Sequence, residues 1–323
     1  MPTDERSDGS AAQAQAALDE LLAKLKEAKK DPFVFLLLGR TGVGKSSTIN
    51  SLMGKQVCAV NDFEPATASV ESYKSEAFGV PFEVIDTPGL CDAPPELGHD
   101  DNYLSMIKSK VQAIDCMWFV SKLNDTRVSA DEKRGIRLIS EAFGHDIWKH
   151  AVIVFTFADA VPDKYLLALE TRTDLIRQEI AKHTSRSDAQ GVPSLAVDNK
   201  SRLTPDGQEW LGELYTQVFT RMSERGITAF YLATASRIAV EDATTRRTYR
   251  PTSPPTATGS SAFSNEIRLT PQQVTEVKKR IDASIIGGLA LTGAAIGSAF
   301  GPGGAVVGGA IGAGIGLIVW FCS

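Results

Sequence analysis

A short run of glycines, serines and one lysine at residues 39–47 (GRTGVGKSS) has the spacing of a phosphate-binding loop. It matches the pattern G-x-x-x-x-G-K-[ST], in which backbone N–H groups and a helix N-terminus cradle phosphates. Lys45 is then placed to bridge the β- and γ-phosphates, and Ser46 to coordinate Mg²⁺. The residues that we expect around the phosphates are Gly39, Arg40, Thr41, Gly42, Val43, Gly44, Lys45, Ser46 and Ser47.

A second element, residues 82–89 (FEVIDTPG), is an apolar run that ends in an aspartate and a glycine. Asp86 is placed to hold the Mg²⁺ shell, and Gly89 can offer its N–H to the γ-phosphate. The segment 61–70 between the two elements is the candidate for a loop that senses Mg²⁺ and the γ-phosphate. Thr67 is the favoured residue for that role, and Ser69 is the alternative.

The preference for guanine depends on side chains that follow two later apolar runs. Asp159 can accept hydrogen bonds from both N–H groups on the guanine edge, which adenine does not offer. The usual pattern has a lysine two residues earlier, where this chain has Phe157. Asn199 and Lys200 supply the other half of the predicted base pocket. The alternative is that Asp159 only caps its loop.

Alternating strand and helix patterns must position these residues. Short apolar runs predict strands at 33–38, 82–85, 114–120, 151–155 and 193–197. Helical patterns cover 45–53, 102–111, 129–143, 163–183, 205–225 and 228–241. Ser129 with Glu132 makes a capping box. This alternation predicts an α/β fold, a three-layer α/β/α sandwich with a mainly parallel sheet, of the P-loop GTPase type.

The quoted motifs, together with residues 127–159 and the run AVDNKSR, resemble the immunity-associated (GIMAP) GTPases and the import-receptor GTPases of the chloroplast outer envelope. Both groups are septin-related P-loop GTPases, and the resemblance covers roughly residues 33–225. It implies a domain that binds GTP and GDP and forms a homodimer across the nucleotide face. It also implies that Asn199 contacts the base and that Arg127 approaches the partner's nucleotide.

Hydrolysis by such a domain relies on positioning and charge stabilisation. Many GTPases have a glutamine directly after the glycine of the second element, but this chain has Leu90. A leucine cannot orient water, so we expect slow intrinsic turnover unless Asp92 or His99 takes that role. The residues that we expect to support catalysis are Lys45, Thr67, Gly89 and Arg127.

The composition places the chain among ordinary soluble proteins, with one exception. It has 323 residues, 43% apolar and 23% charged, with a net charge of −5 and four well-separated cysteines. These values predict no nucleic-acid partner and reduced thiols. From Ser284 to Ser323, however, no residue is charged, and Gly304, Gly308, Gly312 and Gly316 recur every four residues. Such spacing allows close packing of helices in a membrane.

The chain therefore divides into four expected parts. Residues 1–32 hold a disordered segment and an amphipathic helix that packs on the next domain or on a partner. Residues 33–242 form the GTPase domain, 243–268 a linker rich in Pro, Ser and Thr, and 269–323 a basic helix with a Gly-rich hydrophobic helical tail. We expect a helix start at Thr270, capped through Gln273. Residues 284–321 are the predicted membrane segment, as one span or a hairpin, with the GTPase domain facing the cytosol.

Three functions remain open on the sequence. The favoured one is a membrane-tethered GTPase that uses GTP, GDP and Mg²⁺ and dimerises. The second is a GTP-dependent membrane scaffold that hardly hydrolyses its nucleotide. The third is a membrane-perturbing effector gated by the GTPase domain. A tail folded onto the domain of a soluble protein is the alternative to membrane insertion.

Overall fold

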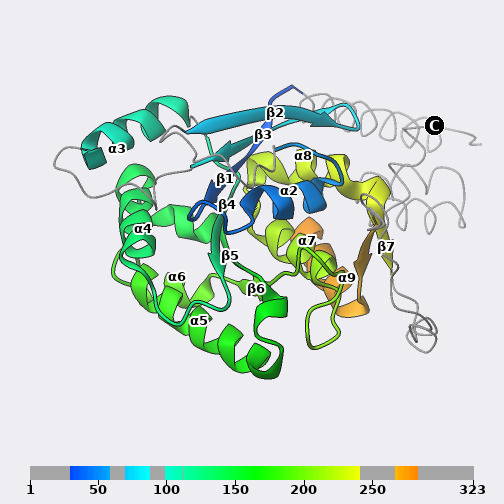
Figure 1. Cartoon of the computed structure of the whole chain (residues 1–323). Coiled ribbons are helices and arrows are strands. Elements are labelled where there is room, and N and C mark those ends of the chain that lie inside the picture. Colours follow the sequence, from blue (N-terminus) through cyan, green and yellow to red (C-terminus); the bar gives the residue numbers. More distant parts are fainter. Residues whose placement is uncertain (1–29, 59–69, 88–98, 112, 241–265, 283–323) are drawn as a thin grey trace, which may run out of the picture.

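One sheet of six strands forms the centre of the molecule, in the order β2-β3-β1-β4-β5-β6 (Figure 1). The computed structural model describes residues 30–58, 70–87, 99–111, 113–240 and 266–282. The strands are β1 Phe33–Leu38, β2 Glu71–Ala77, β3 Val80–Asp86, β4 Cys116–Lys122, β5 Ala151–Thr156 and β6 Ser194–Ala196. Every neighbouring pair is parallel except β2–β3, which is antiparallel. The predicted mainly parallel α/β sheet is confirmed.

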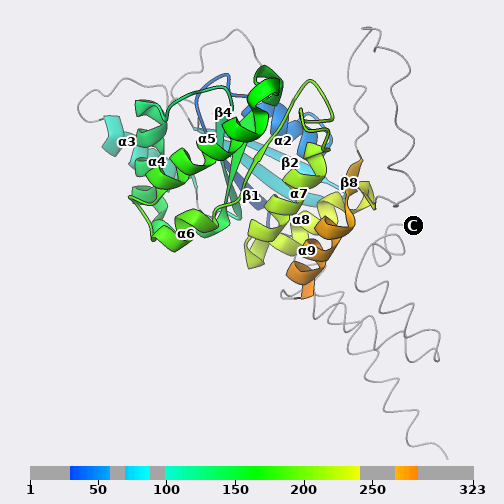
Figure 2. The same ribbon diagram turned by 90° about the horizontal axis from the view of Figure 1, so that it is seen from below.

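Helices cover both faces of this sheet (Figures 1 and 2). On one face lie α2 Lys45–Met53, α7 Trp210–Arg221, α8 Glu224–Thr234 and α9 Pro271–Asp282; on the other lie α3 His99–Lys110, α4 Ala130–Phe143, α5 Tyr165–Ile180 and α6 Arg186–Gly191. Short 3₁₀ turns occupy His145–His150, Ala158–Ala160, Pro162–Lys164 and Ala235–Arg237.

The all-apolar sequence of β1 explains why it lies in the interior. All six of its residues are buried, because a parallel strand in the middle of the sheet has both faces covered. Phe35 and Leu37 pack with α2, α7 and α8, whereas Leu36 and Leu38 pack with α4 and α5. The expected bounds of β1 and α2 agree with those of the structure, and the Ser129–Glu132 capping box is present.

Several elements differ from the sequence-based expectation. The edge strand β2 was not predicted, because its sequence ESYKSEA alternates exposed and half-buried residues and has no apolar run. The short helix α6 was not predicted either. The expected helix 205–225 is α7, which ends at Arg221. The helix expected at 228–241 is α8, which starts earlier because Ser223 accepts a hydrogen bond from the N–H of Gly226, and which ends at Thr234, so that residues 238–240 form strand β7 instead.

A C-terminal strand and helix pack on the same core as the sheet. β7 Ile238–Val240 pairs in parallel with β8 Ile267–Leu269, and α9 lies against α7. Ile267, Leu269 and Val277 are buried in the cluster that contains Phe35. The predicted cap at Thr270 is present, since its N–H donates to Gln273 Oε1 at 2.9 Å. The packed core thus continues to Asp282, beyond the boundary that we expected at residue 242.

Several predicted segments lie outside the described residues: the N-terminal amphipathic helix, nearly all of the loop at 61–70, the linker as far as residue 265, and the Gly-rich tail at 284–321. Within the ranges that the structure describes, no helix has both the length and the apolar character needed to cross a membrane.

Candidate functional site

The glycine loop lies between β1 and α2, at the carboxyl edge of the parallel strands. Gly39 ends the strand with φ 155°, and a Cβ added there would lie 2.2 Å from the Val120 carbonyl oxygen, so only glycine fits. Gly44 is the residue before α2, with φ 90° and no side-chain cap. The first turn of α2 also has no acidic residue. Its N–H groups and the helix dipole therefore favour an anion, as phosphate binding requires.

Lys45 folds back over this loop. Its ammonium donates to the carbonyl oxygens of Gly39 at 2.8 Å and Arg40 at 3.1 Å, and only 5% of the residue is exposed. Nζ also lies 3.4 Å from Asp86 Oδ1. The sequence places these two charges about forty residues apart, and the fold joins them because Leu37 of β1 pairs with Asp86 of β3.

Asp86 carries a buried carboxylate at the end of β3. Burial raises the pKa of Asp86, and the nearby Lys45 ammonium only partly opposes that rise. Its Oδ1 accepts no hydrogen bond from the described residues. Thr87 is fixed behind it, because its hydroxyl donates to the Leu37 carbonyl oxygen at 2.9 Å. A buried oxygen without a hydrogen bond beside a phosphate loop is suited to Mg²⁺, which prefers carboxylate, water and phosphate ligands.

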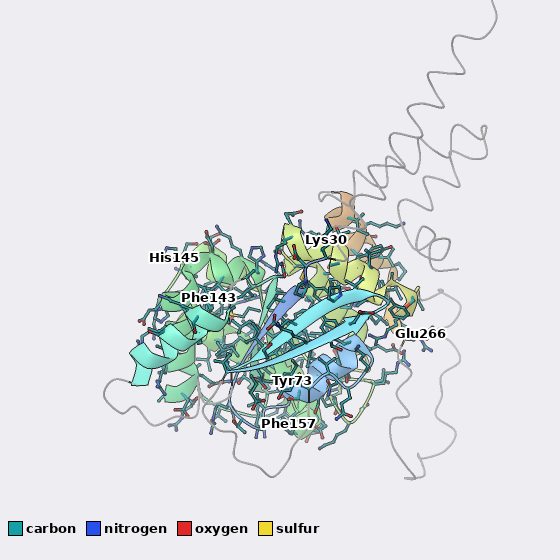
Figure 3. All side chains as sticks on the ribbon, turned by 90° about the horizontal axis from the view of Figure 1, so that it is seen from above. Lys30, Tyr73, Phe143, His145, Phe157 and Glu266 are labelled. Atoms are coloured by element: carbon teal, nitrogen blue, oxygen red, sulfur yellow. The ribbon has the colours of Figure 1, made fainter. Side chains whose placement is uncertain are left out.

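The predicted base-reading residues lie farther along the same edge. Figure 3 shows Phe157 at one end of the sheet and Lys30 and His145 toward the other. Phe157 follows β5 with a left-handed backbone, φ 58°, and the Lys122 ammonium lies 5.1 Å from the centre of its ring. The carboxylate of Asp159 accepts a hydrogen bond from Lys200 Nζ at 2.8 Å. This contact raises the pKa of Lys200.

Asn199, also one of the predicted base-reading residues, lies beside the phosphate loop. Its amide Nδ2 donates to the Thr48 hydroxyl of α2 at 3.1 Å. The same nitrogen lies 3.1 Å from the position that a Cβ on Gly44 would take. Asn199 thus contacts the phosphate-loop helix directly, which brings two predicted site segments together.

Arg127 lies in the turn between β4 and α4, and it is exposed. The predicted residues Thr67 and Gly89 fall outside the described residues, as do the alternative Ser69 and Leu90.

Thr156 and Thr48 also belong to the site, although no motif in the sequence marks them. The Thr156 hydroxyl contacts the Val43 carbonyl oxygen at 2.6 Å and the Ser121 carbonyl oxygen at 3.2 Å. It therefore joins the phosphate loop to the ends of β4 and β5. A hydroxyl at the carboxyl end of an apolar strand is the only signal that could have indicated this role.

Comparison with known proteins gives relatives that match most of the described core. The model of the AIG1 family matches residues 34–187. Translocase of chloroplast 33 from Arabidopsis thaliana is 31% identical over 224 residues, which are 63% of this chain and 73% of that protein. Translocase of chloroplast 34 from Arabidopsis thaliana is 29% identical over 237 residues, 68% of this chain and 74% of that protein.

Solved structures of Toc33 from Arabidopsis thaliana also resemble the chain. The complex with GDP and Mg²⁺ has a TM-score of 0.50 and 28% identity, covering 64% of this chain and 90% of that chain. A dimerisation-deficient arginine-to-alanine mutant has a TM-score of 0.51 and 29% identity, with 64% and 90% covered. A third structure has a TM-score of 0.51 and 29% identity, covering 64% of this chain and 89% of that chain. It was determined in work on atToc33 and psToc159, chloroplast translocon components for whose GTPase activity dimerisation is important.

Proposed function

The chain belongs to the AIG1 family, and on this premise we propose that it binds GTP and GDP with Mg²⁺ and hydrolyses GTP to GDP and phosphate. The observation that carries the proposal is the meeting of Lys45 and Asp86 under the glycine loop, with Nζ and Oδ1 3.4 Å apart. A cation for phosphate and a buried anion for a metal ion are the two charges that nucleoside triphosphate binding needs.

Each residue has one part in this proposal. The N–H groups of residues 39–47 hold the β- and γ-phosphates, and Lys45 turns from the carbonyl oxygens of Gly39 and Arg40 toward the phosphate oxygens. Ser46 and Asp86 would hold Mg²⁺, with Thr67 completing the set and Gly89 donating to the γ-phosphate. Bound Mg²⁺ would neutralise charge that develops on the phosphates.

Guanine recognition is assigned to Asp159, Asn199 and Lys200. The Asp159 carboxylate accepts hydrogen bonds from the two N–H groups of the base, while the Lys200 ammonium stays paired with the same carboxylate. Phe157 offers a flat apolar surface where a lysine stem is usual. The GDP complex of Toc33 supports this choice of base.

Turnover is proposed to be slow in the monomer and faster in a homodimer joined across the nucleotide face. Leu90 cannot orient water, and the exposed Arg127 is supplied to the nucleotide of the partner subunit. An arginine in trans contributes about 10³–10⁵ in rate. Support comes from the Toc33 structures that are described in terms of dimerisation and GTPase activity.

The test is the phosphate release rate per protomer of the full chain over a wide range of protein concentration. The rate should rise as dimers form, and Arg127→Ala should remove most of the rise. A rate that is independent of concentration and unchanged by Arg127→Ala would contradict dimer-dependent hydrolysis. Nucleotide-dependent dimers without turnover would instead favour the scaffold, the second function, which the leucine at position 90 supports.

We also propose that residues 284–321 tether the protein to a membrane, with the GTPase domain on the cytosolic side. The support is the uncharged, glycine-repeated sequence directly after the basic residues Lys278, Lys279 and Arg280. Carbonate extraction of the full chain should leave it in the membrane pellet, whereas a chain that ends at Asp282, which keeps β8 and α9, should be released. Release of both forms would refute the tether.

A further inference from the structure

A buried arginine of α5 reaches the turn that carries Arg127. Arg172 is 2% exposed, yet its guanidinium extends across the interior to α4 and to the end of β4. One terminal nitrogen donates to the carbonyl oxygen of Arg127 at 2.7 Å. The exposed arginine of the proposed dimer contact is therefore joined, through its own backbone, to a buried cation.

The other terminal nitrogen of Arg172 is held by two buried partners. It donates to Ser121 Oγ at 2.7 Å and to Glu132 Oε1 at 2.9 Å. Ser121 in turn donates to Glu132 Oε1 at 2.5 Å. The guanidinium also lies over the Phe155 ring, with Cζ 5.8 Å from its centre. These contacts fix the direction of the arginine fork.

Glu132 fixes the same turn at a second point. Its Oε2 accepts a hydrogen bond from the N–H of Ser129 at 2.7 Å, which is one half of the capping box of α4. The backbone is thus held at the carbonyl of Arg127 and at the N–H of Ser129, on both sides of Val128. The exposed side chain of Arg127 therefore extends from a backbone that the buried Arg172–Glu132 ion pair holds in place.

The cluster is also connected to the phosphate loop. The Thr156 hydroxyl lies within hydrogen-bond distance of both the Ser121 and the Val43 carbonyl oxygens. Helices α4 and α5 lie against each other (Figure 2). This link runs through the backbone carbonyl of Ser121, whereas Arg172 contacts the Ser121 side chain.

We propose that Arg172 is a positioning residue for GTP hydrolysis, which orients Arg127 toward the nucleotide of the partner subunit through the Ser121–Glu132 cluster. The inference rests on the proposed dimer-dependent reaction. A buried ion pair is weak as a source of stability, because its desolvation offsets the attraction. Orientation matters more, because a displacement of about 1 Å in an active site can cost about 10²-fold in rate.

The discriminating substitution is Arg172→Lys in the full chain. Lysine keeps the positive charge beside Glu132, but its single ammonium cannot reproduce the fork that reaches both Arg127 and Ser121. Arg177→Lys is the matched control: Arg177 lies in the same helix and also donates to a backbone carbonyl, that of Val192, at 3.0 and 2.7 Å. The Arg177–Val192 hydrogen bonds do not involve the turn that carries Arg127.

The measurements are GTP turnover against protein concentration, GDP affinity, dimer fraction with a non-hydrolysable GTP analogue, and melting temperature. Arg172→Lys should lower turnover of the dimer by about tenfold to a hundredfold. It should leave GDP affinity and the slow monomer rate unchanged. In the Arg127→Ala background it should have no further effect, because a positioning residue acts only through the residue that it positions. Arg177→Lys should keep the full rate of the dimer.

Three results would overturn the inference. The first is dimer turnover in Arg172→Lys equal to that of the unmodified chain. The second is a loss that adds in full to that of Arg127→Ala, which would indicate an independent role. The third is a loss of GDP affinity in the monomer together with turnover, which would indicate general disruption. If Arg172→Lys does not fold, Ser121→Ala, which keeps the Arg172–Glu132 pair, gives the same comparison with a smaller loss.

The proposed function fails differently. If Arg127→Ala itself has no effect at any concentration, dimer-dependent hydrolysis is wrong, and Arg172 has nothing to position. If Arg127→Ala slows the dimer and Arg172→Lys does not, only the positioning role is wrong.

Discussion

The phosphate half and the base half of the nucleotide edge are built in different ways. The phosphate half, from Gly39 to Ser47 with Asp86, is formed by backbone groups and buried charges between β1, β3 and α2. The base half is formed by side chains of loops that follow β5 and β6. There, Asp159 and Lys200 form an ion pair in which the lysine is 73% exposed.

Because of this difference, residues around the phosphates tolerate fewer substitutions than residues around the base. Around the phosphates, a larger side chain would collide with the packed core, as a Cβ on Gly39 would collide with the Val120 carbonyl oxygen. Around the base, one side chain can replace another at small cost, since surface substitutions usually change stability little. The standard loop pattern is therefore complete at residues 39–47, whereas the base-reading element has Phe157 where a lysine is usual.

The largest effect is expected from Gly39→Ala. Its Cβ would lie 2.2 Å from the Val120 carbonyl oxygen, so β4 or the loop must move. Overpacking of this kind costs about 1–3 kcal/mol, which is roughly 2–12 °C in melting temperature for a domain of this size, and nucleotide binding should be lost. Gly191→Ala is the control, because Gly191 has an ordinary backbone conformation and the nearest side-chain atom, Nη2 of Arg221, lies 3.9 Å from its added Cβ. Equal melting temperatures for the two variants would refute the close approach.

Lys45→Ala should weaken nucleotide binding. Loss of a charged hydrogen-bond donor to phosphate costs about 1.5–3 kcal/mol, which lowers affinity for GDP about tenfold to a hundredfold. Titration with a fluorescent GDP analogue measures it. Unchanged affinity would show that the Lys45 ammonium stays on the Gly39 and Arg40 carbonyls when nucleotide binds.

Asp159→Asn should affect the choice of base and not the phosphates. An amide side chain has one acceptor oxygen, so the two N–H groups of guanine are no longer both satisfied. The ratio of GDP to ADP affinity should fall about tenfold, with ADP affinity unchanged. Asp163→Asn, at an exposed aspartate of the next 3₁₀ turn, is the control. An unchanged ratio would mean that Asp159 only caps its loop.

Lys122→Ala should have the smallest effect. The ammonium lies 5.1 Å from the centre of the Phe157 ring, and such a contact contributes about 0.5–1 kcal/mol at an exposed site. GDP affinity should fall about twofold to fivefold if the contact holds Phe157 against the base. Lys55→Ala removes a similar contact, with Phe82 at 5.4 Å, and should leave GDP affinity unchanged. Equal GDP affinities for Lys122→Ala and Lys55→Ala would show that the Lys122–Phe157 contact does not contribute to base binding.

How much of the fold the sequence could predict depends on whether a feature is encoded by residues close together in the chain. The bounds of α2 and the caps at Ser129 and Thr270 follow from local patterns, because the hydrogen bonds concerned join residues close in the chain. The bounds of β1 follow from its unbroken apolar run, although its hydrogen bonds are made with the distant strands β3 and β4. The edge strand β2 has no such pattern, since its pairing with β3 is made by backbone and its outer side is exposed.

Long-range polar contacts are also not encoded locally. Arg172 lies on a helix in which several polar residues are exposed, and nothing in its neighbours distinguishes it as buried. Its partners Glu132 and Ser121 are 40 and 51 residues away in the chain. Only the packing of α4 and α5 on β4 brings the three together.

The most direct test of the account is competition between GDP and ADP for the full chain loaded with a fluorescent GDP analogue. If Asp159 and Asn199 read guanine despite Phe157, GDP should displace the probe at a concentration about a hundredfold or more below that of ADP, because a site built to bond polar groups rejects the analogue that lacks them. Displacement by GDP and ADP at the same concentration would contradict the account, and would leave a phosphate site without a base preference.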